Sequence, residues 1–242
     1  MSVFPVNILN ASSVTAEGNM SFKIGDTLGV PGNRKMFLEG LDISYENTVC
    51  MQCDHGNTIT MVNRSTHVNN LEATRQEDML VSEVLVTQEK GLALMLLTAD
   101  CLPVSFYDPV THIIALAHFS RQTIAQKLPE ETIAYLSNIH GINPVNIQIS
   151  TGPHISTDSY SFPLPLQHTA PAIAPHITKT DTHAHIDLVA ALKAQLIPLG
   201  ISENSIVISK VDTAISPDYF SYYQSKKENT PDGRFATVLM MR

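Results

Sequence analysis

Short apolar runs separated by polar turns are the main pattern along this chain. The clearest run, GLALMLLT at 91–98, is apolar on both faces and only eight residues long, which is typical of a buried central strand. Comparable runs predict further strands at 3–9, 48–53, 57–63, 104–107, 113–119, 146–150, 206–209 and 235–241. Helical patterns predict helices at 33–41, 123–138 and 187–199. The mixture predicts an α/β fold, and no repeat or clean linker divides residues 1–242, so we expect a single domain.

Two proline and glycine positions refine these expectations. Pro129 falls inside the predicted helix 123–138 and has to sit in an early turn or bend it, whereas Gly200 ends the predicted helix 187–199. Residues 151–182 are rich in Pro, His, Ser and Thr, and we expect an irregular excursion over the surface there.

The charge and composition exclude several functional classes. The formal net charge of −8 argues against non-specific nucleic-acid binding and against docking to an anionic membrane surface. No apolar run approaches the roughly 18 residues of a membrane span, and the start of the chain does not resemble a signal peptide. Three cysteines, an odd number, do not indicate a disulfide framework. We therefore expect a cytoplasmic protein.

Three residues of metal-binding type follow or end predicted strands. Cys101 comes directly after the buried run in Thr98-Ala99-Asp100-Cys101, His118 lies near the end of the strand at 113–119, and His55 lies between two predicted strands. Two imidazoles and a thiolate suit Zn²⁺ and would leave a fourth position for water. Spacing alone leaves the plainer alternative open, in which Cys101 is a small buried hydrophobe and each histidine is structural.

Longer segments around these residues carry a resemblance to a known family. MQCDHGNTI, LLTADCLPVSFYDP, IIALAHFSRQT and the ending YFSYYQSKKENTPDGRFATVLMM occur in the order found in the YfiH family, also called the peptidoglycan-editing-factor or multicopper polyphenol oxidoreductase (laccase-domain) family. The resemblance covers about residues 20–242. It implies an α/β (α+β) fold in which two β-sheets pack between helical layers (α-β-β-α), related to the cytotoxic necrotizing factor toxins. It also implies Zn²⁺ bound by His55, Cys101 and His118.

The resemblance implies chemistry on purine nucleosides. Family members are associated with phosphorolysis of adenosine, inosine, guanosine or methylthioadenosine and with adenosine deamination, so the implied partners are a small-molecule nucleoside and phosphate. An alternative is an amide hydrolase that edits peptidoglycan precursors, using zinc or a Cys101 thiolate with His118 as its base. A third is a catalytically retired binding protein that keeps zinc for stability after the HFSRQT segment closed the pocket. The oligomeric state stays open.

Further residues receive candidate roles. Arg34 and Arg121 are expected to bind phosphate or ribose, because guanidinium groups suit oxyanions. Asp100 either orients a ligand, acts as an acid or base, or merely caps the strand end. In the Cys50-Met51-Gln52-Cys53 match, residues three apart in a strand point to opposite faces, so we expect one thiol in the core and no chelating pair.

The departures from the family pattern concern the surroundings of the ligands. The family's HAGWRG is HFSRQT at 118–123, where either Arg121 or Gln122 takes the place of the motif's arginine. The His-Gly motif has one extra residue in Gln52-Cys53-Asp54-His55-Gly56, and Glu83 replaces an aspartate. Copper is less expected than zinc, because laccase chemistry needs several coppers. The one His-X-His pair, His183-Ala184-His185, is interpreted as a solvated entry to the helix at 187–199.

Overall fold

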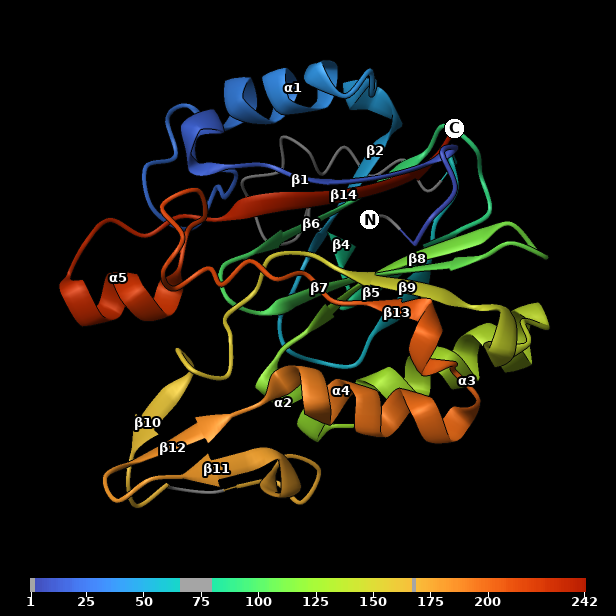
Figure 1. Cartoon of the computed structure of the whole chain (residues 1–242). Helices are drawn as coiled ribbons and strands as arrows, with labels where there is room; N and C mark the ends of the chain where they lie inside the picture. The colour runs from blue at the N-terminus through green and yellow to red at the C-terminus, as the bar shows by residue number, and fades with distance from the viewer. Residues whose placement is uncertain (1–2, 66–79, 167–168) are drawn as a thin grey trace.

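Two large sheets lie face to face in this computed structural model, which describes residues 3–65, 80–166 and 169–242 (Figure 1). The five-stranded sheet has the order β1-β14-β6-β2-β4, with strands Ile8–Ser12, Phe235–Met241, Ala93–Thr98, Thr48–Gln52 and Leu80–Val81. The six-stranded sheet has the order β13-β9-β7-β8-β5-β3, with strands Ile206–Val207, Gln148–Thr151, Leu102–Asp108, Ile113–Phe119, Val84–Thr87 and Ile59–Met61.

Helices cover the outer face of each sheet. Helix α1 (Val30–Gly40) lies on the five-stranded sheet, and α2 (Arg121–Ala125), α3 (Leu128–His140) and α4 (Leu188–Leu196) lie on the six-stranded one (Figure 1). Strand β6 shows why the layers form, because its apolar side chains alternate between the two faces. Ala93 and Met95 pack in the core under α1, whereas Leu94 and Leu96 pack between the sheets. The fold expected from the family resemblance, with its α-β-β-α layers, is confirmed.

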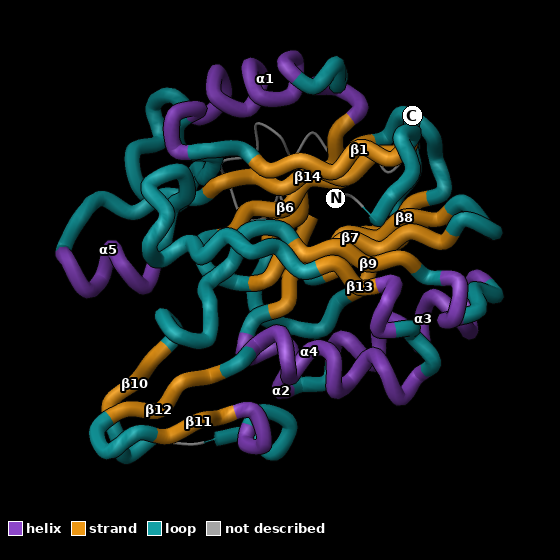
Figure 2. The backbone as a smooth tube through the Cα atoms, viewed as in Figure 1, coloured by secondary structure: helices purple, strands orange, loops and turns teal. Residues whose placement is uncertain are grey.

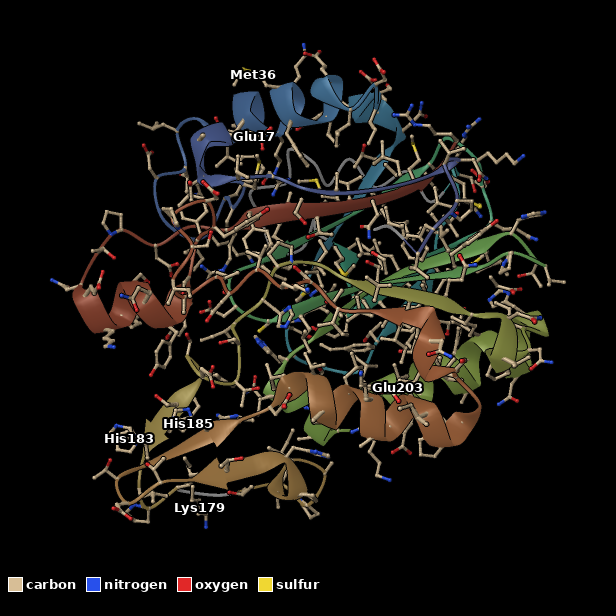
Figure 3. The ribbon with its side chains drawn as sticks, viewed as in Figure 1. Glu17, Met36, Lys179, His183, His185 and Glu203 are labelled. Carbon is tan, nitrogen blue, oxygen red and sulfur yellow. The ribbon has the colours of Figure 1, made fainter. Side chains whose placement is uncertain are left out.

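A third, small sheet stands apart from the two large ones (Figure 2). Its order is β10-β12-β11, with strands Ser161–Pro163, His183–Ile186 and Ile177–Lys179. The expected irregular excursion at 151–182 is therefore wrong for β10 and β11, and His183-Ala184-His185 is part of a strand and not a helix entry (Figure 3). The period-two pattern explains this: Ala184 and Ile186 are buried, while the two histidines are half-buried. Helix α4 begins afterwards, where the Asp187 carboxylate accepts a hydrogen bond from the Ala190 amide at 2.8 Å.

Some predicted bounds need correction. The single helix expected at 123–138 is two helices, because Lys127 adopts a φ of 66° between α2 and α3, and Pro129 then lies in the first turn of α3. The first strand begins at Ile8 and not at residue 3. Strand β5 and helix α5 (Tyr222–Glu228) were not among the expected elements. Short 3₁₀ turns occupy Thr15–Glu17, Tyr45–Asn47, Pro144–Asn146, Ala174–His176, Ile197–Leu199 and Glu203–Ser205.

Within the described ranges, the chain contains no helix with the length and apolar character needed to cross a membrane.

Candidate metal centre and its cleft

The structure brings His55, Cys101 and His118 together. His55 lies in the loop after β2, Cys101 in the turn between β6 and β7, and His118 near the end of β8. One donor atom from each residue lies within 4.8 Å of those from the other two. The two imidazole rings meet edge to face, with centroids 5.2 Å apart. Three segments far apart in the sequence thus converge at one edge of the sheets, as the sequence analysis expected.

Two unusual backbone conformations place these potential donor residues. Asp100 has a φ of 82°, which turns the chain sharply between β6 and β7 and leaves Cys101 at the strand ends. His55 has a φ of 63°. Its conformation is held by the Glu83 carboxylate, whose Oε1 accepts hydrogen bonds from the backbone amides of Asp54 and His55 at 2.8 and 2.7 Å. The loop carrying His55 is therefore fastened to the end of the neighbouring sheet.

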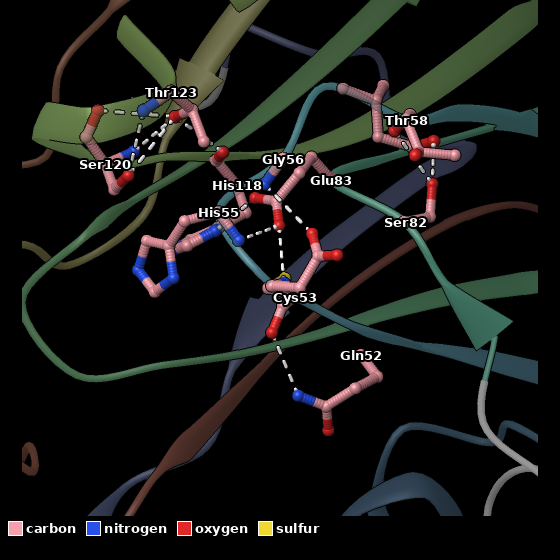
Figure 4. A network of polar contacts seen from close by, with 12 residues as sticks. Gln52, Cys53, His55, Gly56, Thr58, Ser82, Glu83, His118, Ser120 and Thr123 are labelled. Atoms are coloured by element: carbon pink, nitrogen blue, oxygen red, sulfur yellow. Dashed lines mark hydrogen bonds and ion pairs between the residues drawn. The ribbon is translucent and has the colours of Figure 1, made fainter. Parts of the chain in front are cut away.

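Glu83 also orients His118. Its second oxygen, Oε2, accepts a hydrogen bond from His118 Nδ1 at 2.6 Å, and its side chain is completely buried (Figure 4). When Nδ1 carries the proton, the lone pair resides on Nε2, which is the form that a metal ligand needs. One carboxylate thus positions both histidines. In the sequence, Glu83 stands out only as a departure from the family pattern, which assigns it no role.

The Cys101 thiol and the His118 imidazole both have pKa values shifted towards their charged forms. Burial raises the pKa of Cys101, but the adjacent His118 and His55 outweigh it and lower the pKa to about 7. Burial lowers the pKa of His118, but the neighbouring Cys53 and Cys101 outweigh it and hold this pKa well above its usual value. A thiolate is therefore accessible at neutral pH, either as a metal ligand or as a nucleophile.

A second thiol also lies here. The Cys53 sulfur forms a second potential donor group with Glu83 and His118, whose donor atoms all lie within 4.8 Å of one another. Burial raises the pKa of Cys53 more than His118 lowers it. The sequence contained one indication of this position, since Cys53 lies in the His-Gly motif that has an extra residue.

The donor groups border a cleft of ≈ 980 Å³. One wall carries Arg121 and Gln122 from α2, with the Arg121 guanidinium 5.1 Å from the centre of the Phe162 ring. The lining is cationic although the whole chain has a net charge of −8. Its positively charged members are Lys23, Arg121, Lys226, Lys227 and Arg234, and its one carboxylate is Asp100. This charge distribution suits an anionic ligand.

Asp100 and Arg34 have structural partners. The Asp100 carboxylate accepts hydrogen bonds from the Thr213 hydroxyl and the Tyr223 amide, both at 2.7 Å, and so ties the end of β6 to the start of α5. Burial raises the pKa of Asp100 more than these bonds lower it. The arrangement favours the capping role among those considered. Arg34 is buried on α1, where its Nε donates to the Met20 carbonyl at 2.8 Å, and it is not among the residues that line the cleft.

The donor set fits one soft or borderline metal ion. Two imidazoles and a thiolate, with one histidine held by a buried carboxylate, are the ligands and the supporting contact typical of zinc sites. A multi-copper site does not fit as well. Both donor groups found among the described residues include His118, so these residues supply no separate set for further coppers.

Comparison with known proteins places this geometry in context. A family model described as multi-copper polyphenol oxidoreductase laccase matches residues 10–242. A purine nucleoside phosphorylase of Corynebacterium glutamicum is 30% identical over 241 residues, covering 96% of this chain and 91% of that protein. Another, from Streptomyces coelicolor, is 29% identical over 214 residues, covering 87% of this chain and 84% of that protein.

Solved structures show the same fold. The YlmD protein of Geobacillus stearothermophilus aligns with a TM-score of 0.85 at 22% identity, covering 98% of this chain and 93% of that one. The hypothetical protein YfiH of Bacillus licheniformis aligns with a TM-score of 0.82 at 21% identity, covering 97% and 93%.

Proposed function

The chain belongs to the multi-copper polyphenol oxidoreductase laccase family, and from this premise we propose that it is a zinc-dependent purine nucleoside phosphorylase. The observation that carries the proposal is the convergence of His55, Cys101 and His118 at the edge of a large cationic cleft. The relatives named purine nucleoside phosphorylases, which align over most of the chain, support the substrate class. The site geometry supports the metal dependence.

The cleft offers separate surfaces for the two substrates. Aromatic side chains of Tyr160, Phe162 and Tyr223 line it and provide faces on which a purine can stack. Arg121, held over the Phe162 ring, presents a guanidinium to phosphate. In phosphorolysis a phosphate oxygen bonds to C1′ of the ribose while the C1′–N bond breaks, and the purine leaves with the bonding electrons and takes up a proton. A bound Zn²⁺ would supply positive charge where phosphate is oriented.

Metal content and phosphate-dependent turnover test this proposal together. Protein purified without an affinity tag should contain about one zinc per chain, the stoichiometry of a site with three protein ligands. It should release purine base from adenosine or inosine only when phosphate is present. Cys101→Ser and His118→Ala should lose both metal and turnover. His183→Ala, a histidine variant on the small sheet outside both donor groups, should retain both.

Two outcomes would replace the proposal. Conversion of adenosine to inosine without phosphate would indicate a deaminase at the same centre. Amide hydrolysis that survives removal of the metal by a chelator would indicate a Cys101 thiolate acting with His118, an alternative supported by the lowered pKa of Cys101, which is about 7. Wild-type protein without metal and without turnover would contradict both the zinc enzyme and the proposed substrate class.

A further inference from the structure

Cys53 is a cleft-lining thiol that the proposed reaction does not use. It follows β2 directly and begins the loop that carries His55. Its sulfur lies within 4.8 Å of a ring nitrogen of His118, the residue shared by the two donor groups. The two sulfurs of Cys53 and Cys101 therefore approach the same imidazole. An imidazole flanked by two thiols is an unusual environment for a residue whose role is only to pack.

The neighbouring cysteine provides an internal comparison. Cys50 is buried on β2 and packs with the residues beneath α1, whereas Cys53 packs against the core between the two sheets and reaches the metal centre. This separation follows from strand geometry, in which residues three apart point to opposite faces. Cys50 and Cys53 thus do not form a chelating pair. Only Cys53 is placed to approach a metal ion bound by His118.

We propose that Cys53 supplies a second thiolate to the metal ion, which completes a Cys₂His₂ donor set with Cys101, His55 and His118. The inference rests on the metal-binding part of the proposed function. In a tetrahedral zinc site with ligand distances of about 2.0–2.3 Å, two donor atoms lie roughly 3.5 Å apart. The Cys53 sulfur lies within 4.8 Å of a His118 nitrogen, but among the described residues no such group contains Cys53 together with Cys101 or His55. Cys53 therefore completes the set by rotating its side chain towards the ion.

Glu83 has a different role in this arrangement. Its two oxygens are engaged by His118 Nδ1 and by the amides of Asp54 and His55, so it orients ligands and does not bind the ion itself. A centre with two thiolates selects soft or borderline ions such as Zn²⁺, Cd²⁺ and Cu⁺ over Mg²⁺ or Mn²⁺.

The adjacent cleft distinguishes this centre from a closed structural zinc site. Cys53 and Cys101 both line the ≈ 980 Å³ space, so a ligand in the cleft can reach the ion. A substrate group that carries an O–H, such as dihydrogen phosphate, would be able to take that position, with its proton passing to the Cys53 thiolate as the sulfur leaves as a thiol. The exchange changes no oxidation state. Cys53 therefore fills the fourth position at rest and yields it when substrate binds.

Cobalt substitution counts the thiolate ligands directly. The metal-free full-length chain is titrated with Co²⁺, and the sulfur-to-cobalt charge-transfer absorption is measured, because its intensity grows with the number of bound thiolates. Wild type should reach about twice the intensity of Cys53→Ser, since that variant keeps one of two sulfur ligands. Cys50→Ser, the matched control from the same strand, should give the wild-type intensity. Circular dichroism of each variant verifies that it is folded.

The outcomes separate this inference from the proposed function. A Cys53→Ser variant with the full wild-type absorption would overturn the second-thiolate role while leaving the zinc enzyme intact. A wild type that binds no cobalt would overturn the metal centre and this inference together. Competition with a zinc chelator gives an independent measurement, in which Cys53→Ser should bind Zn²⁺ more weakly and Cys50→Ser should not.

Discussion

Glu83→Gln tests the claim that one buried carboxylate organises the metal centre. The substitution keeps the size of the side chain and one acceptor oxygen, which can still receive the amides of Asp54 and His55. The other end becomes an amide NH₂, which cannot accept a proton from His118 Nδ1. The imidazole is then expected to place its hydrogen on Nε2 and present Nδ1 to the new NH₂ group. In that tautomer Nε2 cannot bind a metal ion.

The structure sets the size of the effect. The bond from His118 Nδ1 to Glu83 is 2.6 Å long, fully buried and made to a charged acceptor. Hydrogen bonds to charged groups contribute about 1.5–3 kcal/mol. We therefore expect the free energy of unfolding of the metal-free protein to fall by about that amount. Loss of a contact that orients a metal-binding histidine typically weakens metal affinity by about 10–100-fold, and we expect the Zn²⁺ affinity of Glu83→Gln to fall within that range.

Urea denaturation and chelator competition measure the two effects separately. Glu89→Gln is the matched control, because the Glu89 carboxylate also accepts a backbone hydrogen bond, from the Arg64 amide at 2.9 Å. The Glu89 side chain is 37% exposed, so solvent screens its charge and its interactions contribute much less to stability than those of Glu83. Its unfolding free energy should change by less than about 0.5 kcal/mol, and its zinc affinity should not change. A Glu83→Gln variant with wild-type zinc affinity would refute the positioning role, whatever its stability.

Three further predictions address the core, a polar cluster and the cleft. Leu96→Ala, in the core between the sheets, should lower the unfolding free energy by about 2–5 kcal/mol in urea denaturation. Asp212 has a lowered pKa because hydrogen bonds from Ser156 and Ser159, both 2.6 Å, outweigh its partial burial, so it stabilises the fold above its unfolded pKa. Asp212→Asn should thus be less stable than wild type at neutral pH, and the difference should shrink as the pH falls through the lowered pKa. Arg121→Gln should raise the KM for phosphate by about tenfold or more, the size of one charge-assisted hydrogen bond, while an unchanged KM would place phosphate elsewhere.

The hydrophobic pattern predicts the strands of the fold better than its helices and its smallest sheet. The strands at 113–119 and 235–241 are predicted with their observed bounds, because six of the seven residues in each are apolar. The break between α2 and α3 depends on the left-handed backbone conformation of Lys127. Lysine has no preference for that conformation, so the sequence does not predict the break. Strands β10 and β11 are only three residues long, and each is completed by pairing with β12, so their formation depends on that pairing and not on a local apolar run.

The three candidate donor residues could be proposed from the sequence, but the residues that support them could not. His55, Cys101 and His118 each stand in a segment whose residues resemble a family motif, so sequence comparison identifies them. Glu83 and Cys53 act through contacts between different strands, and their importance emerges only when β2, β5 and β8 are brought together. Arg34 remains a predicted phosphate ligand without a place at the cleft wall, because its guanidinium is engaged by the Met20 carbonyl beneath α1.

The altered segment HFSRQT also shows why the retired-protein alternative is less favourable than an enzyme. Its first two changed residues are directed inwards: Phe119 is completely buried in the core, and the Ser120 hydroxyl accepts the amide hydrogen of Thr123 at 3.1 Å to cap α2. Arg121 and Gln122 both line the cleft. The cleft therefore contains a guanidinium group whichever of the two residues occupies the position of the motif's arginine. The cleft still has a volume of ≈ 980 Å³ beside the donor groups. The residues that differ from the family motif therefore change the wall of the cleft but do not fill it. Such a change is expected to alter substrate selectivity before it abolishes turnover, since the proposed ligands and their carboxylate support are all kept.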